Sequence, residues 1–288
     1  MHKSSEDLVN SSTGTLYIVP TPIGNLSDIS KRAIDVLQEV DLIAAEDTRH
    51  SGQLLQHFLI KTRTISLHDH NEQQRTQMLI QKLQEGVNIA LISDAGTPLI
   101  SDPGYTLVST CRQHQLTVIA LPGPCALTTA LSGSGLPTDR FMFMGFLPVK
   151  QKAKNDALHF AAHTHMTCIF YEAPRRIKDT IEKCIEVLPD NHLIVLAKEI
   201  SKRFENYISG SAKEVLDWLL AEPAHQKGEF VLMIYCKAVV AEELPIAARE
   251  LMQQLIVLLP PKSAAAVVSE HYGVNKKSLY QYALGLKE

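Results

Sequence analysis

The stretch LISDAGTPLISDPG, residues 91–104, decides how the rest of the chain is interpreted. The apolar run 87–92 leads into it and the amphipathic run 105–114 follows it, so the sequence predicts a strand, a long loop and a helix. Glycine and proline shape such a loop, and Asp, Ser and Thr can bind their own backbone or a ligand. The loop exceeds the roughly 2–6 residues usual after a strand of an α/β sheet, which favours a ligand site.

The alternative is that this loop is only a capped connection. Ser101 or Asp102 would then be the N-cap of the following helix, and Pro103 would occupy its first position. The length of the loop makes us prefer the ligand site.

The composition bounds the class of protein. With 288 residues, 45% of them hydrophobic, the chain can form two domains and a small appendage. A net charge of −3 excludes a global positive field, so any RNA site must be a local patch. Five scattered cysteines without a C-x-x-C pair argue against structural zinc and fit a reducing cytosol. The polar start has no signal-peptide core and no run could span a membrane, so we expect a soluble, cytoplasmic protein.

Apolar and amphipathic runs alternate through the first half. They predict a parallel or mostly parallel sheet with helices on both faces. The predicted strands are residues 16–19, 42–45, 64–67, 87–92 and 117–121. Neither a G-x-G-x-x-G fingerprint nor a Walker loop follows them. The last strand leads into a segment rich in small residues, 122–137, which allows close approach of a ligand.

Ionisable residues follow two of these strands. Glu46-Asp47-Thr48-Arg49-His50 comes after the second strand, and either Asp47 or Thr48 could also cap a helix there. His68 and His70, after the third strand, have H-x-H spacing, but no partner with metal-ligand spacing accompanies them. We therefore expect a polar loop and no metal.

The second half predicts another α/β domain, with shorter strands. Its predicted strands are residues 141–146, 167–171, 193–197, 205–209 and 229–235. Residues 140–203 carry eleven Lys/Arg against seven Asp/Glu, which could be an ordinary solvated face. Arg175, Arg176, Lys198, Lys202 and Arg203 follow two strand ends, however, and this clustering favours a rim that binds the phosphates of a polynucleotide.

The end of the chain predicts three helices, at residues 246–259, 262–271 and 276–284. The glycine turn between the last two resembles a helix-turn-helix unit, with Lys276 and Lys277 at the start of the second helix. A packing or dimerisation module is the alternative.

Six motifs occur together and in order. They are LYIVPTPIGNL (16–26), AEDTR (45–49), SDAGTPLISDPG (93–104), LPGP (121–124), YEAPRR (171–176) and GEFV (228–231). This set resembles the ribosomal RNA small subunit methyltransferase I family, which belongs to the tetrapyrrole methylase-like methyltransferases. The resemblance covers about residues 14 to 238, and the helical end is similar to that family's appendage.

The resemblance implies a two-domain tetrapyrrole methylase-like α/β fold with a cleft between the domains and a C-terminal helical, helix-turn-helix-like appendage. The expected parts are a disordered tail (1–13), an N-terminal domain (14–122), a C-terminal domain (123–240) and the appendage (241–288). It further implies a homodimer with S-adenosyl-L-methionine in the cleft. The implied reaction is 2′-O-methylation of a cytidine, number 1402 in the family, in 16S rRNA, either free or in the small ribosomal subunit.

Mapped onto this sequence, the resemblance implies three groups of site residues. The cofactor would be bound by Ser93, Asp94, Gly96, Thr97, Ile100, Cys125, Ala126, Tyr171, Glu172 and Phe230. RNA would be bound by Arg49, His68, Arg175, Arg176, Lys198 and Arg203. The candidates for a general base are Glu46, Asp47, Asp94, His68 and Glu199, with Glu46 and Asp47 ranked first because both follow a strand on the cofactor side.

Two rival functions remain. A methylase of a tetrapyrrole precursor, in cobalamin or sirohaem synthesis, would also favour an Arg-lined cleft, but the AEDTR and YEAPRR motifs and the helical end argue against it. A nucleic-acid-binding regulator that reads its target with the helical end would leave the two loop-rich domains without a purpose.

Overall fold

The computed structural model describes residues 13–237 and 244–286. Contacts divide the chain into two compact units, which meet between Cys236 and Lys237. The predicted tail lies, apart from residue 13, outside the described residues, and so does the predicted boundary at 240/241. The domain boundaries therefore stay predictions.

The first sheet is wholly parallel, as the alternation of runs predicts. Its strands are β1 (Thr15–Ile18), β2 (Leu42–Ala45), β3 (Thr64–Ser66), β4 (Ile89–Ile92) and β5 (Thr117–Ala120). They lie in the order β3-β2-β4-β1-β5. Parallel strands end at one edge, so the loops after β1, β2, β4 and β5 gather at the same side of the sheet.

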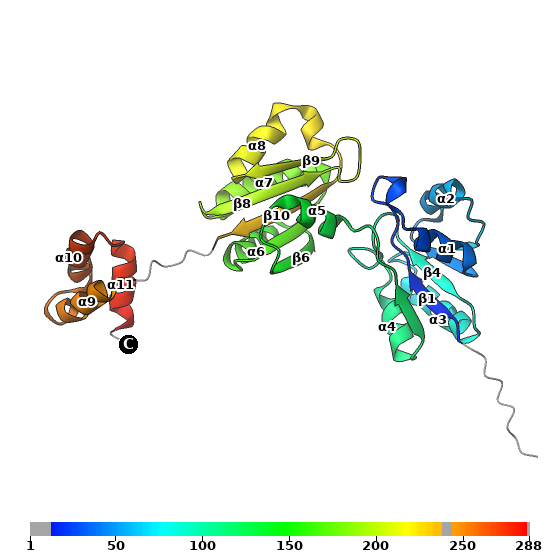
Figure 1. Ribbon diagram of the computed structural model, residues 1–288, viewed down its shortest axis with the longest axis horizontal. Helices are drawn as coiled ribbons and strands as arrows, with labels where there is room; N and C mark the ends of the chain where they lie inside the picture. The colour runs from blue at the N-terminus through cyan, green and yellow to red at the C-terminus, as the bar shows by residue number, and fades with distance from the viewer. Residues whose placement is uncertain (1–12, 238–243, 287–288) are drawn as a thin grey trace, which may run out of the picture. The chain divides into compact units, whose positions relative to one another are not determined.

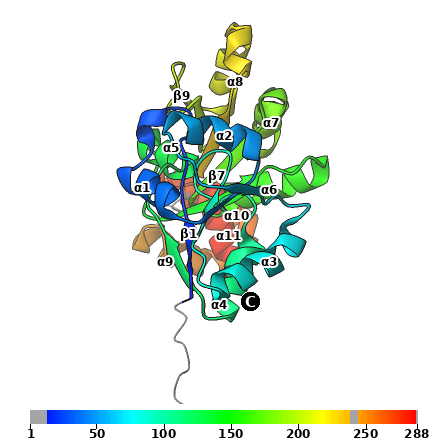
Figure 2. The ribbon, with the colours of Figure 1, turned by 90° about the vertical axis from the view of Figure 1, so that its right-hand side faces the viewer.

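Helices cover both faces of this sheet: α1 (Lys31–Glu39), α2 (Thr48–His57), α3 (Glu72–Gln84) and α4 (Tyr105–Gln113). Leu42 and Ala44 pack in the core with α3 and α4, whereas Ile43 and Ala45 pack with α1 and α2. Figures 1 and 2 show these helix pairs on opposite sides of β1. Successive side chains of β2 point to opposite faces of the sheet, and both faces are covered, so β2 is apolar throughout.

Helix α4 does not begin as the capped-connection alternative expects. It starts at Tyr105, and its N-cap is Gly104, which has a φ of 124° and no side-chain cap. A Cβ on Gly104 would lie 2.6 Å from Leu91 Cδ2, so this close approach requires glycine. The alternative in which Ser101 or Asp102 caps the helix is therefore wrong, and neither side chain is used as the cap of α4.

The second sheet is mixed. Its strands are β6 (Phe141–Phe146), β7 (Thr167–Glu172), β8 (His192–Lys198), β9 (Asn206–Gly210) and β10 (Phe230–Cys236), in the order β6-β7-β10-β8-β9. Only β6 and β7 pair in parallel; the other three pairs are antiparallel. The expectation of shorter strands is wrong, since β10 pairs with β8 along seven residues, from Phe230 to Cys236.

Four helices cover the second sheet: α5 (Ala126–Ser134), α6 (Gln151–His163), α7 (Pro174–Val187) and α8 (Ala212–Ala221). Helices α6, α7 and α8 pack on one face, around Phe170. Helix α5, which the sequence did not predict, packs on the other face. Ile23, from the loop after β1, joins that second core, so this loop physically ties the two sheets together.

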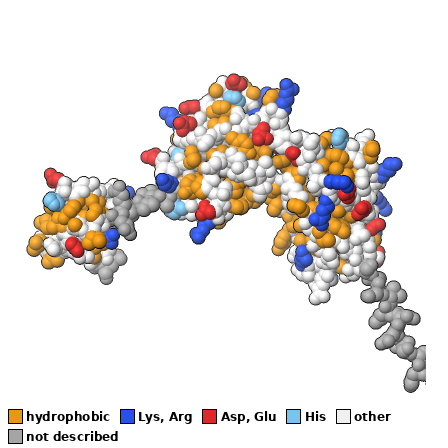
Figure 3. Space-filling model, viewed as in Figure 1, with side chains coloured by type: hydrophobic (Ala, Val, Ile, Leu, Met, Phe, Trp, Pro, Cys, Tyr) orange, Lys and Arg blue, Asp and Glu red, His pale blue; other side chains and the backbone are white. Residues whose placement is uncertain are grey.

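The second unit is a three-helix appendage of α9 (Ile246–Leu258), α10 (Pro261–Tyr272) and α11 (Lys276–Gly285), as predicted. Its core includes Met252, Val268 and Leu279. Gly273 ends α10 with a φ of 65°, and Asn275 caps α11. Figure 3 shows apolar side chains on its surface. Val257 and Leu258 are among its exposed apolar residues. Among the described residues, no helix has the length and apolar character needed to cross a membrane.

Candidate functional site: a pocket between the two sheets

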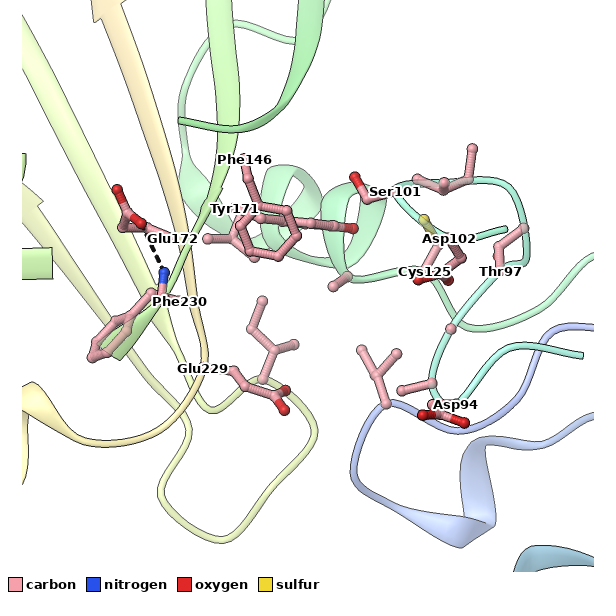
Figure 4. A pocket seen from close by; sticks show the side chains of 18 of the residues that line it. Asp94, Thr97, Ser101, Asp102, Cys125, Phe146, Tyr171, Glu172, Glu229 and Phe230 are labelled. Atoms are coloured by element: carbon pink, nitrogen blue, oxygen red, sulfur yellow. Dashed lines mark hydrogen bonds between the residues drawn. The ribbon is translucent and has the colours of Figure 1, made fainter. Parts of the chain in front are cut away.

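A pocket of about 410 Å³ lies at the carboxyl edge of the first sheet. Figure 4 shows side chains of the first half, such as Asp94 and Asp102, facing Phe146 and Tyr171 of the second half. The lining consists of Ile23, Glu46, Asp94, Ala95, Gly96, Thr97, Ile100, Ser101, Asp102, Cys125, Ala126, Phe146, Tyr171, Glu172, Ala173, Pro174, Ile200, Glu229, Phe230 and Val231. Its volume is in the range of small-molecule sites.

The loop at 93–104 is held in an unusual conformation. Thr21 and Gly96 exchange two backbone hydrogen bonds of 2.8 and 3.0 Å, and Thr97 Oγ1 donates to Pro124 O at 2.9 Å. Leu99 and Ser101 have φ values of 71° and 69°, in the left-handed region that non-glycine residues avoid. Backbone strain of this kind concentrates at functional sites because the surrounding contacts hold it in place.

The charged residues that line the pocket are all acidic. Glu46, Asp94 and Asp102 line it without an ion pair to any described Lys, Arg or His. Asp94 Oδ1 accepts a 3.1 Å bond from Asp47 N, and Asp94 N donates at 3.3 Å to Glu46 Oε2. These reciprocal bonds join the ends of β2 and β4 and place two carboxylates side by side.

Burial and mutual repulsion change the protonation of this cluster. Burial raises the pKa of Asp102 to about 6; a bond from the Ser93 hydroxyl opposes this shift, and the charges of Glu46 and Asp94 add to it. Burial also raises the pKa of Glu46 above its ordinary value, although its bond from Asp94 N counteracts part of the shift. A site in which carboxylates repel one another attracts a cation.

Aromatic rings form the opposite wall. Tyr171 contacts Phe143 and Phe146 edge to face, with ring centroids 4.9 and 5.6 Å apart. Its hydroxyl oxygen accepts a 3.2 Å bond from Leu127 N at the start of α5, and burial raises its pKa. This bond orients the ring and joins β7 to α5.

Glu172 lines the pocket with its backbone side but uses its carboxylate elsewhere. Oε1 forms a 3.1 Å ion pair with Arg176 Nε, and Oε2 accepts a 2.7 Å bond from Thr180 Oγ1. Figure 4 shows the bond from the following backbone N–H, with the carboxylate turned away from Asp94. Arg176 also donates to the carbonyls of Leu147 and Pro148. The Glu172–Arg176 pair thus connects β7 and α7 to the turn after β6.

The structure brings together nine of the ten predicted cofactor residues as pocket lining. The exception is Ser93, which is 2% exposed and lies beneath the loop, where its hydroxyl donates to Ala95 O at 3.3 Å. Of the two preferred bases, Glu46 lines the pocket, while Asp47 caps α2 by accepting from Arg49 N at 2.8 Å. The backbone N–H of Arg49 lowers the pKa of Asp47.

The predicted RNA residues fall into two groups. Arg49, Arg175 and Arg203 are exposed. The others are less available: Arg176 is ion-paired, Lys198 is buried at the end of β8, and His68 Nε2 lies 3.0 Å from Asn71 Nδ2. Of the remaining base candidates, Asp94 lines the pocket, whereas His68 and Glu199 are absent from its lining.

Sequence reasoning missed several lining residues. Ser101 and Asp102 were considered only as helix caps, although they lie inside the loop that the sequence singled out. Glu229 lies inside the GEFV motif and Phe146 ends a predicted strand, so position relative to a strand end was the available signal. Ile23 lies inside the LYIVPTPIGNL motif, to which no site residue was assigned, and Ile200 lies in the loop after β8, outside all six motifs.

A second pocket, of about 280 Å³, shares Ile23, Asp94, Ala95 and Glu229 with the first. Its other lining residues are Thr21, Pro22, Gly24, Leu26, His50, Ser51, Gln53, Leu54, Ser93 and Lys202. The two pockets therefore have a common wall, which hereafter is called the shared wall.

Lys202 anchors the shared wall. Its Nζ lies 3.0 Å from both Glu199 Oε1 and Glu229 Oε2. These carboxylates raise the lysine pKa despite partial burial. The stem of Lys202 lies against Gly24, where an added Cβ would come within 2.4 Å of Lys202 Cγ. The glycine thus lets the loop after β1 pack on the loop after β8.

Comparison with known proteins agrees with the motif set. Residues 15–216 match the family described as Tetrapyrrole (Corrin/Porphyrin) Methylases, and residues 242–287 match the RsmI C-terminal HTH domain. The chain is 52% identical over 283 residues, 98% of each chain, to "Ribosomal RNA small subunit methyltransferase I" of Escherichia coli O157:H7. It is 52% identical to the protein of the same name from Vibrio cholerae serotype O1, over 93% of this chain and 94% of that one.

A solved structure supports the fold. Uroporphyrin-III C-methyl transferase from Thermus thermophilus, complexed with S-adenyl homocysteine, matches with a TM-score of 0.53 at 14% identity, over 76% of this chain and 97% of that one. The expected tetrapyrrole methylase-like fold with a helix-turn-helix appendage is therefore confirmed. The extent and level of identity to the named relatives confirm the expected family as well: the chain belongs to the ribosomal RNA small subunit methyltransferase I family.

Proposed function

We propose that the chain transfers the methyl group of S-adenosyl-L-methionine to the ribose 2′-hydroxyl of a cytidine in 16S rRNA, at position 1402. Family membership makes the chain an S-adenosyl-L-methionine-dependent methyltransferase of small-subunit rRNA. The observation that carries the proposal is the first pocket, where three unpaired carboxylates and no Lys, Arg or His occur among the lining residues. The 2′-oxygen and the cytidine follow from the motif resemblance.

The lining fits the cofactor. S-adenosyl-L-methionine carries positive charge on its sulfonium and its ammonium groups, and Asp94, Asp102 and Glu46 would attract both. Ile100, Phe230 and Val231 give the pocket apolar surface suited to an adenine ring. Gly96 has a φ of 83° and lets a ligand approach the main chain. A polycarboxylate tetrapyrrole would instead be repelled by this lining.

The chemistry needs alignment and removal of a proton. The cofactor supplies a methyl carbon on a positive sulfur; as the ribose oxygen bonds to that carbon, the carbon–sulfur bond breaks and sulfur keeps the electron pair. Holding the two reactants in line can supply much of the rate acceleration. Glu46, whose pKa burial raises above its ordinary value, is the proposed acceptor of the hydroxyl proton, and a positioned base typically contributes about 10²–10⁴-fold.

The RNA would be bound by the exposed Arg49, Arg175 and Arg203, because the planar guanidinium binds phosphate oxygens in a bidentate manner. We also propose that the enzyme acts as a homodimer in the cytoplasm. Light scattering that gives the mass of a single chain would contradict the dimer.

The decisive experiment is transfer of a tritiated methyl group to small ribosomal subunits from a strain that lacks the modification. We expect label in a dinucleotide that resists alkaline hydrolysis, since a 2′-O-methyl group blocks cleavage at that linkage. Glu46→Gln should lower kcat by about 10²–10⁴-fold and weaken cofactor binding far less, because Asp94 and Asp102 keep their charges in the first pocket. Label on a tetrapyrrole precursor, or in alkali-sensitive nucleotides only, would overturn the proposal.

A further inference from the structure

We propose that the second pocket receives the single nucleotide to be methylated, flipped out of the RNA, with its ribose at the shared wall. The inference rests on the proposed methyl transfer and names the place where the acceptor binds. Four observations support it: the shared wall, an unpartnered buried hydroxyl, the polar and apolar composition of the lining, and an exposed basic side chain beside it.

The two pockets share part of their lining. Ile23, Asp94, Ala95 and Glu229 line both pockets, so ligands in the two pockets would contact the same four residues. Methyl transfer requires such adjacency, because nucleophile and methyl carbon must approach to about 3–3.5 Å. The second pocket is about 280 Å³ against about 410 Å³ for the first, in keeping with a nucleotide beside a larger cofactor.

A buried hydroxyl in the second pocket lacks a partner. Ser51 is 3% exposed, and its Oγ makes no hydrogen bond to any described residue. Its backbone N–H is already used, as it donates to Asp47 O at 2.9 Å in the first turn of α2. Native proteins pair nearly all buried polar groups, and Ser51 is the described residue with such an unpartnered atom that lines either of the two pockets, so its hydroxyl can serve a ligand there.

The rest of the lining suits a nucleobase. Pro22, Leu26 and Leu54 supply apolar surface, and His50 and Gln53 supply a ring and an amide. Neither the His50 ring nor the Gln53 amide is hydrogen-bonded to another described residue, so both are available to a ligand within the described part of the chain. Splayed-out bases in RNA are recognised through stacking on rings and hydrogen bonds along their polar edges.

The charge near the second pocket suits the attached phosphates. Four lining residues come from the first two turns of α2 (Thr48–His57), whose N-terminus is capped by the Asp47 carboxylate, so an exposed basic side chain near it would bind the phosphates. Arg49 precedes His50, and its side chain is 92% exposed. Lys202 also lines the second pocket, but its ammonium group is ion-paired with Glu199 and Glu229. It therefore stabilises the shared wall and does not bind phosphate.

The test compares Ser51→Ala and Gln53→Ala with two matched controls. Thr76→Val alters another buried, unpartnered hydroxyl that lies in neither pocket, and Gln56→Ala removes an exposed amide from the same helix as Gln53. The assay is methyl transfer to undermodified small subunits, with KM and kcat measured separately. Calorimetry with S-adenosylhomocysteine and thermal melting of each variant complete the set.

We expect both pocket variants to raise the KM for subunits about tenfold, because each loses a hydrogen bond to the nucleotide. S-adenosylhomocysteine affinity should not change, and the controls should behave as the unaltered protein. The melting temperature of Ser51→Ala should stay the same or rise, since its hydroxyl has no partner to lose in the folded chain.

Unchanged KM in both pocket variants would overturn the inference, and so would an equal loss of S-adenosylhomocysteine affinity. A melting temperature of Ser51→Ala that falls together with the rise in KM would show a structural role and overturn the role of that hydroxyl. If the unaltered chain fails to methylate subunits, the proposed function itself is wrong, which this design separates from a failure of the pocket assignment.

Discussion

The two adjoining pockets differ in charge although they share a wall. The first contains three carboxylates, Glu46, Asp94 and Asp102, that no described cation neutralises, whereas the second has only Asp94 of these three and adds Lys202, which is paired with Glu229 of the same lining and with Glu199. The difference shows that two adjoining pockets can bind two ligands of different charge. A cation is favoured where carboxylates remain unpaired, and a polar, near-neutral group is favoured where they are paired.

The carboxylates of the first pocket also have two different roles. Glu172 is ion-paired and stabilises the fold, whereas the unpaired carboxylates can bind a ligand. Arg176→Ala tests this division with the largest expected effect. It leaves the Glu172 carboxylate, which is 0% exposed, buried without its cation, and unfolding free energy should fall by about 3–5 kcal/mol.

Urea denaturation measures this loss, and Arg175→Ala is the matched control because the neighbouring side chain is exposed. Equal stability of the two variants would mean that the Glu172–Arg176 pair does not hold the second sheet together.

Asp94→Ala should weaken cofactor binding about 10- to 150-fold, as measured by calorimetry. It removes an unpaired negative charge from the first pocket together with the bond that Asp94 Oδ1 accepts from Asp47 N. The expected loss is about 1.5–3 kcal/mol, the usual range for a hydrogen bond to a charged group.

Asp94→Asn separates the two causes, since its amide oxygen can still accept from Asp47 N while the charge is gone. A variant Asp94→Ala that binds S-adenosyl-L-methionine normally would refute the assignment of the first pocket to the cofactor.

Arg175→Ala should weaken RNA binding by about 1 kcal/mol and reduce the salt dependence of binding by about one counterion. Cofactor affinity should remain the same, because Arg175 lines neither pocket. Filter binding over a range of salt concentrations measures the first quantity and calorimetry the second. Parallel loss of RNA and cofactor binding would contradict the separation of the two surfaces.

Asp102→Asn should give the smallest effect, a gain in stability at pH 8 of about 1 kcal/mol after allowance for partial exposure. Burial raises the pKa of Asp102 from 3.8 to about 6, so between these values the folded chain binds more protons than the unfolded chain. Stability due to this group therefore falls as pH rises through that interval.

The advantage of the asparagine should consequently be present above pH 6 and vanish below pH 4, as followed by urea denaturation across the range. A gain that is the same at pH 4 and pH 8 would show that ionisation of Asp102 is not its cause.

Much of the fold follows from patterns along the chain. Short apolar runs that alternate with amphipathic runs predicted all five strands of the first sheet to within a few residues. The reason is that strands buried on both faces are apolar throughout. The small-residue segment at 122–137 hid α5, since its sequence has no charged face to reveal a helical period. The bounds of the second sheet's strands were predicted to within one residue, but their antiparallel pairing was not, because β8 and β10 lie far apart in sequence.

The site divides in the same way. Position after a strand end was sufficient to predict most of the first pocket, since parallel strands deliver their following loops to one edge. The second pocket was not predicted, because its lining combines a loop, the start of α2 and Lys202, residues that only packing brings together.

By itself, the sequence determined the family, the parallel sheet and the loop at 93–104 as the place of a ligand. The tertiary structure decided what neighbouring side chains do there. Asp47 caps α2 while Glu46 lines the pocket, and Arg176 is bound to Glu172 and to carbonyls after β6 while Arg175 stays exposed. The reason is that spacing along a chain predicts the face of an element, whereas the partner of a charged group is set by whichever distant backbone or side chain folding places within hydrogen-bond distance.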